Sequence, residues 1–267
     1  MAPGDGGRGH PAPPAERPTH SSRAGPCRGF LTMQARRGSR ALALALAPVL
    51  WTQGQRVHRG TPVLPEAAGP PTGVCGSGGP CRLLVLGEST AAGVGASDHT
   101  SGLAGQLARA LAERLGLEVS WQALGRSGYT AQRALSELVP RLEGSFDVIV
   151  VTLGVNDVLR LTSRTRWCHD VRALVAALHH HLSLRGRLVL AGVPRVDGMP
   201  ALPRPTRAAL GLHARSLDTS LARIITPRTT VTHLPLPAFD DPEIFACDNL
   251  HPSPSATAGG RSCSPTT

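Results

Sequence analysis

The stretch LVLGESTAAGVG, residues 84–95, decides the fold. An apolar run stops at Gly87, Glu88 and Ser89 follow at once, and small residues with two further glycines come next. A near-continuous apolar run of this length is typical of a buried parallel strand. Ligands of open α/β sheets bind where such strands end. The stretch therefore predicts a serine presented at the tip of a buried strand, on a loop too small to cover it.

Other parts of the chain repeat this pattern and alternate with helical spacing. Apolar runs of strand length occupy 82–87, 146–154, 187–194 and, more weakly, 231–237, while the alternating run 117–124 fits an edge or near-edge strand. Apolar residues at three- and four-residue spacing predict helices over 103–115, 135–142, 167–178 and 217–224. Strands that alternate with helices indicate right-handed βαβ units, and hence a three-layer α/β domain with a central parallel sheet.

The composition excludes several classes of protein. The formal net charge of the 267 residues is +10, but residues 1–60 hold nine arginines against Asp5 and Glu16. A basic end on a near-neutral domain, with 3% aromatic residues, argues against a nucleic-acid-binding core. All basic residues counted as Lys or Arg are arginine. The absence of lysine from the sequence excludes a Walker phosphate-binding loop and Schiff-base chemistry.

Cysteine and histidine give no metal or cofactor signal. The six cysteines form no C-x-x-C and have no zinc spacing with histidine. Cys75 and Cys81 are close enough in sequence to close a small disulfide loop, but we favour free thiols. His179–His181 are consecutive, so their side chains point in different directions on a helix, and we interpret them as a surface feature. We expect no metal and no organic cofactor.

The two ends of the chain differ in composition from the predicted domain. Residues 1–32 predict disorder, with an untranslated stretch as a second interpretation. A basic and then apolar segment, 33–51, contains the apolar run 41–51, which is too short to span a membrane. An export signal, an interfacial anchor and a plain helix are its three interpretations, and its cleavage site is poor. We expect 52–81 to be a linker, 82–252 the domain and 253–267 an irregular tail.

Residues suited to acyl transfer follow the predicted strands. Ser89 is a candidate nucleophile, and His251 is a candidate base, with Asp248 three residues earlier on the same helical turn to orient it. The backbone N–H of Ser89 at a helix N-terminus, the N–H of Gly128 and the side-chain amide of Asn156 can donate to an oxyanion. The competing interpretations are that Asn156 only forms a turn and that His251 is an ordinary surface histidine.

These residues resemble the four blocks of the SGNH hydrolases, also called GDSL esterases and lipases. GVND at 154–157 and DNLHP at 248–252 match most closely, and the resemblance covers about 82–252, with a basic, proline-containing lead before it. It implies a flavodoxin-like SGNH fold and assigns Ser89, Asp248 and His251 to a triad. It also assigns Ser89, Gly128 and Asn156 to the oxyanion hole.

The chain departs from the family pattern at two places. Glu88 stands where the family usually has aspartate, and we expect its extra methylene to misplace the hydrogen bonds of the loop. The sequence after His251 has no apolar period, whereas family members usually continue into an amphipathic helix. We therefore expect a truncation or frameshift just past residue 252.

The resemblance implies hydrolysis of a carboxylic ester: a short acyl ester, a lysophospholipid or an acetylated sugar. The competing hypothesis is a catalytically impaired, membrane-associated relic of the fold. Expected partners are a small-molecule or lipid ester and a membrane contacted through 41–51, with no nucleic acid. We expect an exported or membrane-associated bacterial protein on the periplasmic side, and a cytoplasmic location stays open.

Overall fold

A computed structural model describes residues 38–225, 230–237, 245–248 and 251. The expectations for residues 1–32 and 253–267 concern parts of the chain outside these ranges.

Within the described residues, the sheet contains six strands in the order β1-β3-β2-β4-β5-β6. All neighbouring pairs are parallel except β1 with β3. The strands are β1 (Thr72–Cys75), β2 (Gly79–Gly87), β3 (Leu117–Gly125), β4 (Phe146–Thr152), β5 (Leu182–Ala191) and β6 (Val231–Leu234). The strands predicted after the linker all form, and β3 lies second from the edge. The parallel strands follow a flavodoxin-like order, whose switch point lies at β2.

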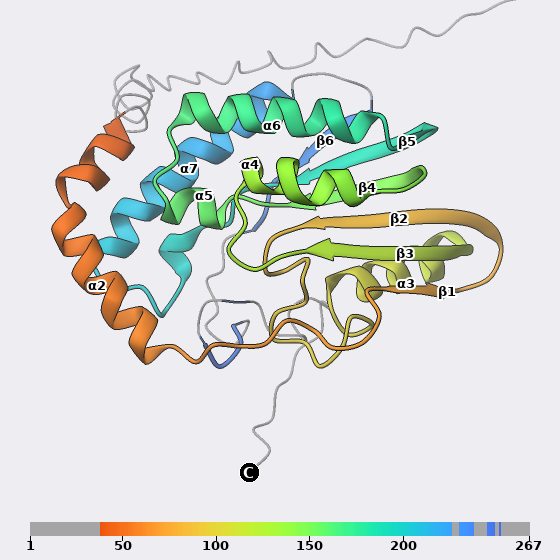
Figure 1. Ribbon diagram of the computed structural model, residues 1–267, viewed down its shortest axis with the longest axis horizontal. Helices are drawn as coiled ribbons and strands as arrows, with labels where there is room; N and C mark the ends of the chain where they lie inside the picture. The colour runs from red at the N-terminus through yellow and green to blue at the C-terminus, as the bar shows by residue number, and fades with distance from the viewer. Residues whose placement is uncertain (1–37, 226–229, 238–244, 249–250, 252–267) are drawn as a thin grey trace, which may run out of the picture.

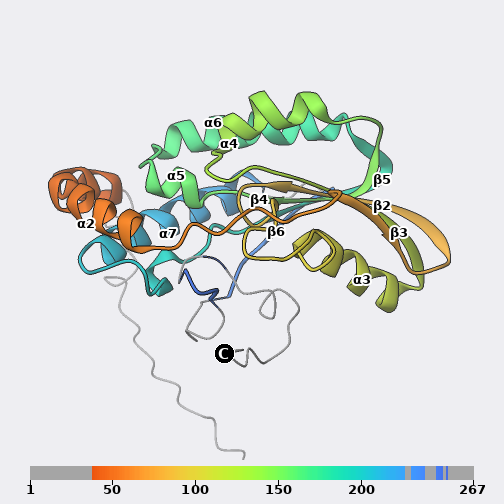
Figure 2. The ribbon, with the colours of Figure 1, turned by 60° about the horizontal axis from the view of Figure 1, so that its bottom comes forward.

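Helices cover both faces of the sheet. The helical segments are α2 (Ala47–Gly60), α3 (Leu103–Leu115), α4 (Ala131–Arg133) with its continuations η1 (Ala134–Leu138) and η2 (Val139–Arg141), α5 (Val155–Leu159), α6 (Arg164–His179), η3 (Val196–Gly198) and α7 (Thr206–Ile224). Helices α4 and α6 lie on one side of the sheet, and α3 lies on the other (Figure 2). This is the three-layer α/β architecture that the sequence predicts.

The core divides into two clusters, one on each face. Ile149 and Val151 of β4 are buried against α6 and α7, and Leu83 and Val85 of β2 are buried against α3. The alanines of α3 let this helix approach the sheet closely. Trp167 joins two helices of the larger cluster, because its indole N–H donates to the Leu217 carbonyl at 3.2 Å.

The predicted linker contributes to the sheet. Strand β1 and the first residues of β2 fall within 52–81, and β1 pairs antiparallel with β3. The sequence pattern does not predict this short strand, because the segment is rich in glycine and proline and only Val74 and Cys75 of the strand are apolar. Cys75 and Cys81 both pair with Val119, one from each side of β3. Two strand spacings separate their Cα atoms by about 10 Å, which is beyond the reach of a disulfide, and both thiols are free.

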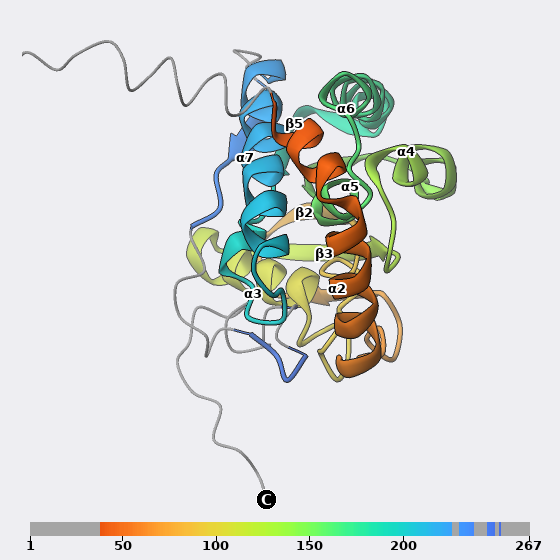
Figure 3. The same ribbon diagram turned by 90° about the vertical axis from the view of Figure 1, so that its left-hand side faces the viewer.

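The segment 33–51 is helical where the structure describes it, from residue 38 to 45, and α2 follows. Arg40 Nε donates to the Leu161 carbonyl at 2.8 Å, and Gln53 Nε2 donates to the Arg204 carbonyl at 3.0 Å. Helix α2 therefore runs beside α7, near the end of the sheet to which β2 and β3 point (Figures 1 and 3). In the described part of the chain, no helix is long and apolar enough to cross a membrane.

We expect Trp167→Ala to lower the free energy of unfolding by about 3–5 kcal/mol, because it leaves a cavity between α6 and α7. Trp167 is 1% exposed. Trp167→Phe should cost less, since a ring still fills most of the space. Trp51→Ala is the control: Trp51 is 68% exposed, so its change should stay within about 0.5 kcal/mol. Urea titration measures all three, and equal losses for Trp167→Ala and Trp51→Ala would contradict the role of Trp167.

Candidate active site

The loops that carry the predicted site residues begin at one edge of the sheet. Gly87, the last residue of β2, pairs with Gly125 of β3 and Thr152 of β4. The Arg126 N–H donates to the Gly87 carbonyl at 3.2 Å, and the Glu88 N–H donates to the Thr152 carbonyl at 3.1 Å. Backbone hydrogen bonds thus hold the starts of all three loops together.

Two glycines permit this close approach. A Cβ on Gly87 would lie 2.2 Å from the Thr152 carbonyl oxygen, and a Cβ on Gly125 would lie 2.3 Å from the Ala92 nitrogen. Both contacts involve backbone atoms, which cannot rotate away as a side chain can. Any larger residue at either position would push residues 88–102, the nucleophile loop between β2 and α3, away from the neighbouring loops.

Ser89 is half-buried and lies in a series of tight turns. The Ala92 N–H donates to the Glu88 carbonyl, and the Val94 N–H donates to the Ser89 carbonyl, each at 3.0 Å. Helix α3 begins only at Leu103. The expectation that Ser89 lies at a helix N-terminus is therefore wrong, because glycines interrupt the segment before a regular helix can start. Ser89 Oγ makes no hydrogen bond to another described residue.

Glu88 connects the nucleophile loop to the GVND block. It is 4% exposed, and its carboxylate accepts hydrogen bonds from the N–H groups of Val155 at 2.9 Å and Asn156 at 3.1 Å. It also accepts one from the side-chain amide of Asn156. The expectation of misplaced hydrogen bonds is wrong, because the longer side chain reaches the start of α5. This contact fixes the amide of Asn156 and leaves its second N–H for another acceptor.

Asp157 connects the GVND block to the loop of Gly128. Its side chain is buried and accepts the Ala131 N–H at 2.9 Å, at the start of α4. Burial raises the pKa of Asp157 to about 6. Burial likewise raises the pKa of Glu88 to about 7, against the opposing effect of the Val155 and Asn156 N–H groups. Two buried carboxylates therefore lie behind the candidate site, and both favour the protonated form more than a carboxyl group in water does.

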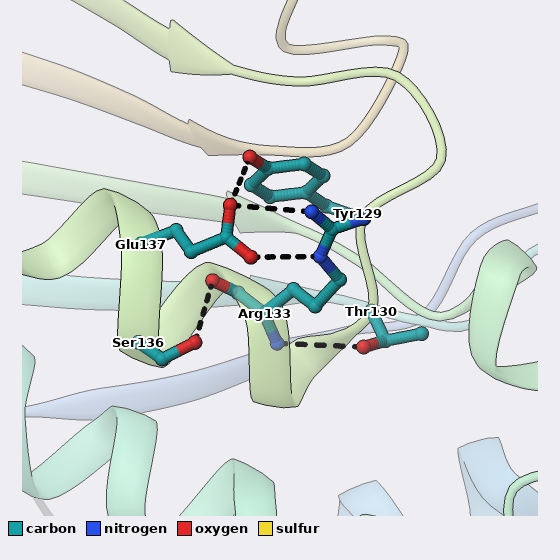
Figure 4. Close-up of polar contacts among 5 residues, drawn as sticks. All are labelled: Tyr129, Thr130, Arg133, Ser136 and Glu137. Atoms are coloured by element: carbon teal, nitrogen blue, oxygen red, sulfur yellow. Dashed lines mark hydrogen bonds and ion pairs between the residues drawn. The ribbon is translucent and has the colours of Figure 1, made fainter.

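Gly128 has the conformation and the space that its predicted role needs. Its φ is +81°, a value that other residues rarely adopt, and a Cβ there would meet no atom within 4 Å. The position that a side chain would occupy at Gly128 is therefore open space. The next residue, Tyr129, is buried and donates its hydroxyl hydrogen to Glu137, whose carboxylate also accepts from Arg133 Nε at 2.8 Å (Figure 4). The Arg133 guanidinium lies over the Tyr129 ring, 4.4 Å from its centre, so the carboxyl side of this loop is firmly held.

Asp248 and His251 form the predicted acid–imidazole pair. His251 Nδ1 lies 2.5 Å from Asp248 Oδ2, and the His251 N–H donates to Asp248 Oδ1 at 3.0 Å. Asp248 is 3% exposed and lies in a turn, with residues 249–250 outside the described ranges. The Ala246 N–H donates to the His251 carbonyl at 2.8 Å. The side chain of Ala246 lies 3.8 Å from where a Cβ on Gly95 would stand, so the pair is next to the nucleophile loop.

The structure thus brings Ser89, Gly128 and Asn156 to adjacent strand ends, and it pairs Asp248 with His251 next to Gly95 of the loop that carries Ser89. In the ranges that the structure describes, Ser89 and His251 make no direct hydrogen bond. Catalytic hydrogen bonds of this kind often tighten only when substrate binds. The roles of these residues in catalysis stay predictions.

Sequence reasoning missed the residues that hold the loops in place. The sequence pattern assigns no role to Asp157, Tyr129 or Glu137. Glu66, in the predicted linker, accepts the Ser127 N–H at 2.8 Å. An acidic residue between two prolines was the only sequence signal for it, and such a signal is weak.

Comparison with known proteins identifies the relatives of this chain. Residues 85–258 match the model of the GDSL-like Lipase/Acylhydrolase family. The chain is 27% identical over 239 residues to the GDSL-like esterase Rv1075c of Mycobacterium tuberculosis (strain ATCC 25618 / H37Rv), covering 77% of this chain and 71% of the relative. The crystal structure of TesA superposes with a TM-score of 0.50 at 21% identity, covering 66% of this chain and 91% of that chain. This last likeness concerns the fold.

We predict that Glu88 makes stability depend on pH. Its pKa is about 7 in the folded chain and near 4.5 when unfolded, so between these values the folded state holds a proton that the unfolded state has lost. The free energy of unfolding should then fall as pH rises from 5 to 8, by on the order of 1–3 kcal/mol. Glu88→Gln should flatten this slope, as urea titrations across the pH range would show.

Asp157→Asn should flatten the same curve over a lower range, because the pKa of Asp157 is about 6. Curves of unchanged slope for both variants would show that these carboxyl groups titrate alike in the folded and unfolded chain.

Proposed function

This chain belongs to the GDSL-like lipase/acylhydrolase family, and from that premise we propose that it hydrolyses carboxylic esters through an acyl-enzyme on Ser89. The observation that carries the proposal is the Asp248–His251 pair beside the nucleophile loop. Asp248 accepts from Nδ1, which leaves Nε2 of His251 as the basic nitrogen. A weakly nucleophilic hydroxyl needs such a base.

The reaction proceeds in two halves. Ser89 Oγ forms a bond to the ester carbonyl carbon while its proton passes to His251 Nε2, and the protonated ring then gives that proton to the departing alcohol as its C–O bond breaks. Water repeats the sequence on the acyl-enzyme and releases the acid. Asp248, which is 3% exposed, stabilises the positively charged ring in both halves.

The negative oxygen of each tetrahedral intermediate needs donors that are already in place. We assign this role to the backbone N–H groups of Ser89 and Gly128 and to the second side-chain N–H of Asn156. The open space beside Gly128 and the hydrogen bond from Asn156 to Glu88 support the assignment. Fixed donors need no reorganisation during the reaction, which is why they lower its barrier.

The residues after Ser89 leave room for an acyl group. Thr90, Ala91, Ala92 and Gly93 are small, and the last three are buried. We propose short acyl esters as the substrate class, with lysophospholipids and acetylated sugars as the alternatives that a substrate panel would separate. An impaired relic of the fold is the competing proposal. The hydrogen bonds that Glu88 accepts from the Val155 and Asn156 N–H groups support an active enzyme over this relic.

We expect the purified chain to hydrolyse p-nitrophenyl acetate and to react once with a fluorophosphonate probe, both through Ser89. Ser89→Ala should abolish both signals. Ser97→Ala is the matched control, since Ser97 is an exposed serine of the same loop and should change neither. Asn156→Ala should lower kcat by roughly 10²–10³-fold, the usual cost of one oxyanion donor. Equal labelling of Ser89→Ala would overturn the assignment, and an inert wild-type chain would favour the relic.

We also propose that residues 38–60 bring the protein to an anionic membrane surface. This helical stretch holds three arginines and no acidic residue. Leu42, Leu44 and Trp51 are 46%, 47% and 68% exposed on it. Exposed apolar side chains beside arginines are typical of helices that lie in the membrane interface.

The chain should float with vesicles that contain phosphatidylglycerol and much less with neutral phosphatidylcholine vesicles. Trp51→Ser combined with Leu44→Ser should weaken this binding by roughly thirtyfold or more, because each buried apolar side chain contributes about 1 kcal/mol or more. Leu115→Ser is the control, since Leu115 is 62% exposed on α3. Equal loss of flotation in this control would refute a specific role for 38–60, as would equal binding to both kinds of vesicle.

A further inference from the structure

Residues 65–68, which precede the family domain, lie along the nucleophile loop. The Gly95 N–H donates to the Pro65 carbonyl at 3.4 Å, and the Ala67 N–H donates to the Ala92 carbonyl at 3.1 Å. Ala68 continues this contact, with its N–H bonded to the Ser97 carbonyl at 3.3 Å. The backbone on both sides of Glu66 is therefore fixed to the loop that presents Ser89.

From this position the Glu66 side chain reaches the loop of Gly128. Its Oε1 accepts the Ser127 N–H at 2.8 Å, a hydrogen bond strengthened by the negative charge. Its Oε2 lies 3.9 Å from Arg126 Nη1, but these side chains are 36% and 65% exposed, and so this ion pair contributes little. The hydrogen bond to the backbone is thus the stronger of the two contacts.

This hydrogen bond adds to two backbone bonds of the same loop, from the Arg126 N–H to the Gly87 carbonyl and from the Tyr129 N–H to the Arg126 carbonyl. Arg126 and Ser127 are exposed, and Gly128 has the unusual φ of +81°. On the carboxyl side of Gly128, the hydrogen bond from the Tyr129 hydroxyl to Glu137 holds the loop (Figure 4). On its amino side Glu66 holds the peptide one residue before the Gly128 N–H.

We propose that Glu66 is a positioning residue for the oxyanion hole: it fixes the Gly128 N–H relative to Ser89 by binding both loops. This inference rests on the proposed function and extends it to a residue outside the matched family region, 85–258. Because Glu66 acts on an oxyanion donor and not on substrate affinity, its loss reduces kcat and leaves KM nearly unchanged.

The test compares Glu66→Ala with Glu66→Gln, which keeps an oxygen that can accept the Ser127 N–H but removes the charge. With p-nitrophenyl acetate, Glu66→Ala should lower kcat by roughly 10–100-fold, as small displacements of catalytic groups do. KM should change by less than about threefold. Glu66→Gln should recover most of the activity. Glu118→Ala is the control, since Glu118 is exposed at the amino end of β3, the end of the strand away from the site.

Two further measurements separate the outcomes. Glu66→Ala should slow the fluorophosphonate reaction while Ser89 is still labelled once, and it should speed hydrogen exchange at the Ser127 and Gly128 amides. A kcat equal to that of wild type, or unchanged exchange at these amides, would overturn the role of Glu66. An unlabelled wild-type chain would instead overturn the proposed function, and the exchange measurement would still decide whether Glu66 holds the loop.

Discussion

A carboxylate that is almost wholly removed from water needs hydrogen-bond donors, and the architecture of the candidate site depends on how Glu88 obtains them. Its oxygens take the N–H groups at the start of α5 and the amide of Asn156. Without these bonds the buried charge would cost several kcal/mol. The same hydrogen bonds bring the GVND block to the nucleophile loop. The need of the buried Glu88 carboxylate for donors therefore fixes these two sequence blocks relative to each other.

The block that contains Gly128 is joined in a similar way. Asp157 satisfies the first N–H of α4, and backbone bonds join Arg126 to Gly87. Each link connects a loop to its neighbour across the sheet edge, and none depends on substrate. The donors that we propose for an oxyanion are thereby held in place without substrate, and such preorganisation is usually the largest contribution to this kind of catalysis.

The sequence predicted the fold well because β2, β4 and β5 are apolar runs and α3 and α6 keep strict helical spacing. It also predicted the Asp248–His251 pair, since three residues separate them. It failed where tertiary contacts override local signals. Strand β1 exists because β3 offers a free edge, which no property of residues 72–75 reveals. The fit of Glu88 could not be foreseen either, because the position of α5 relative to β2 decides whether an extra methylene reaches or overshoots.

The same limit explains why the sequence predicts a linker over residues 52–81. Proline and glycine keep a segment from forming a helix or a long strand. They do not prevent its backbone from forming hydrogen bonds with the backbone of other segments. The N–H and carbonyl groups of residues 65–68 form hydrogen bonds with the nucleophile loop, and the carbonyl of residue 71 accepts the Ala123 N–H at 2.7 Å. A segment with this many backbone bonds to the core is part of the domain. The folded domain therefore begins before the region in which the family motifs occur, and Glu66, a side chain that no motif contains, already contacts the loop of Gly128.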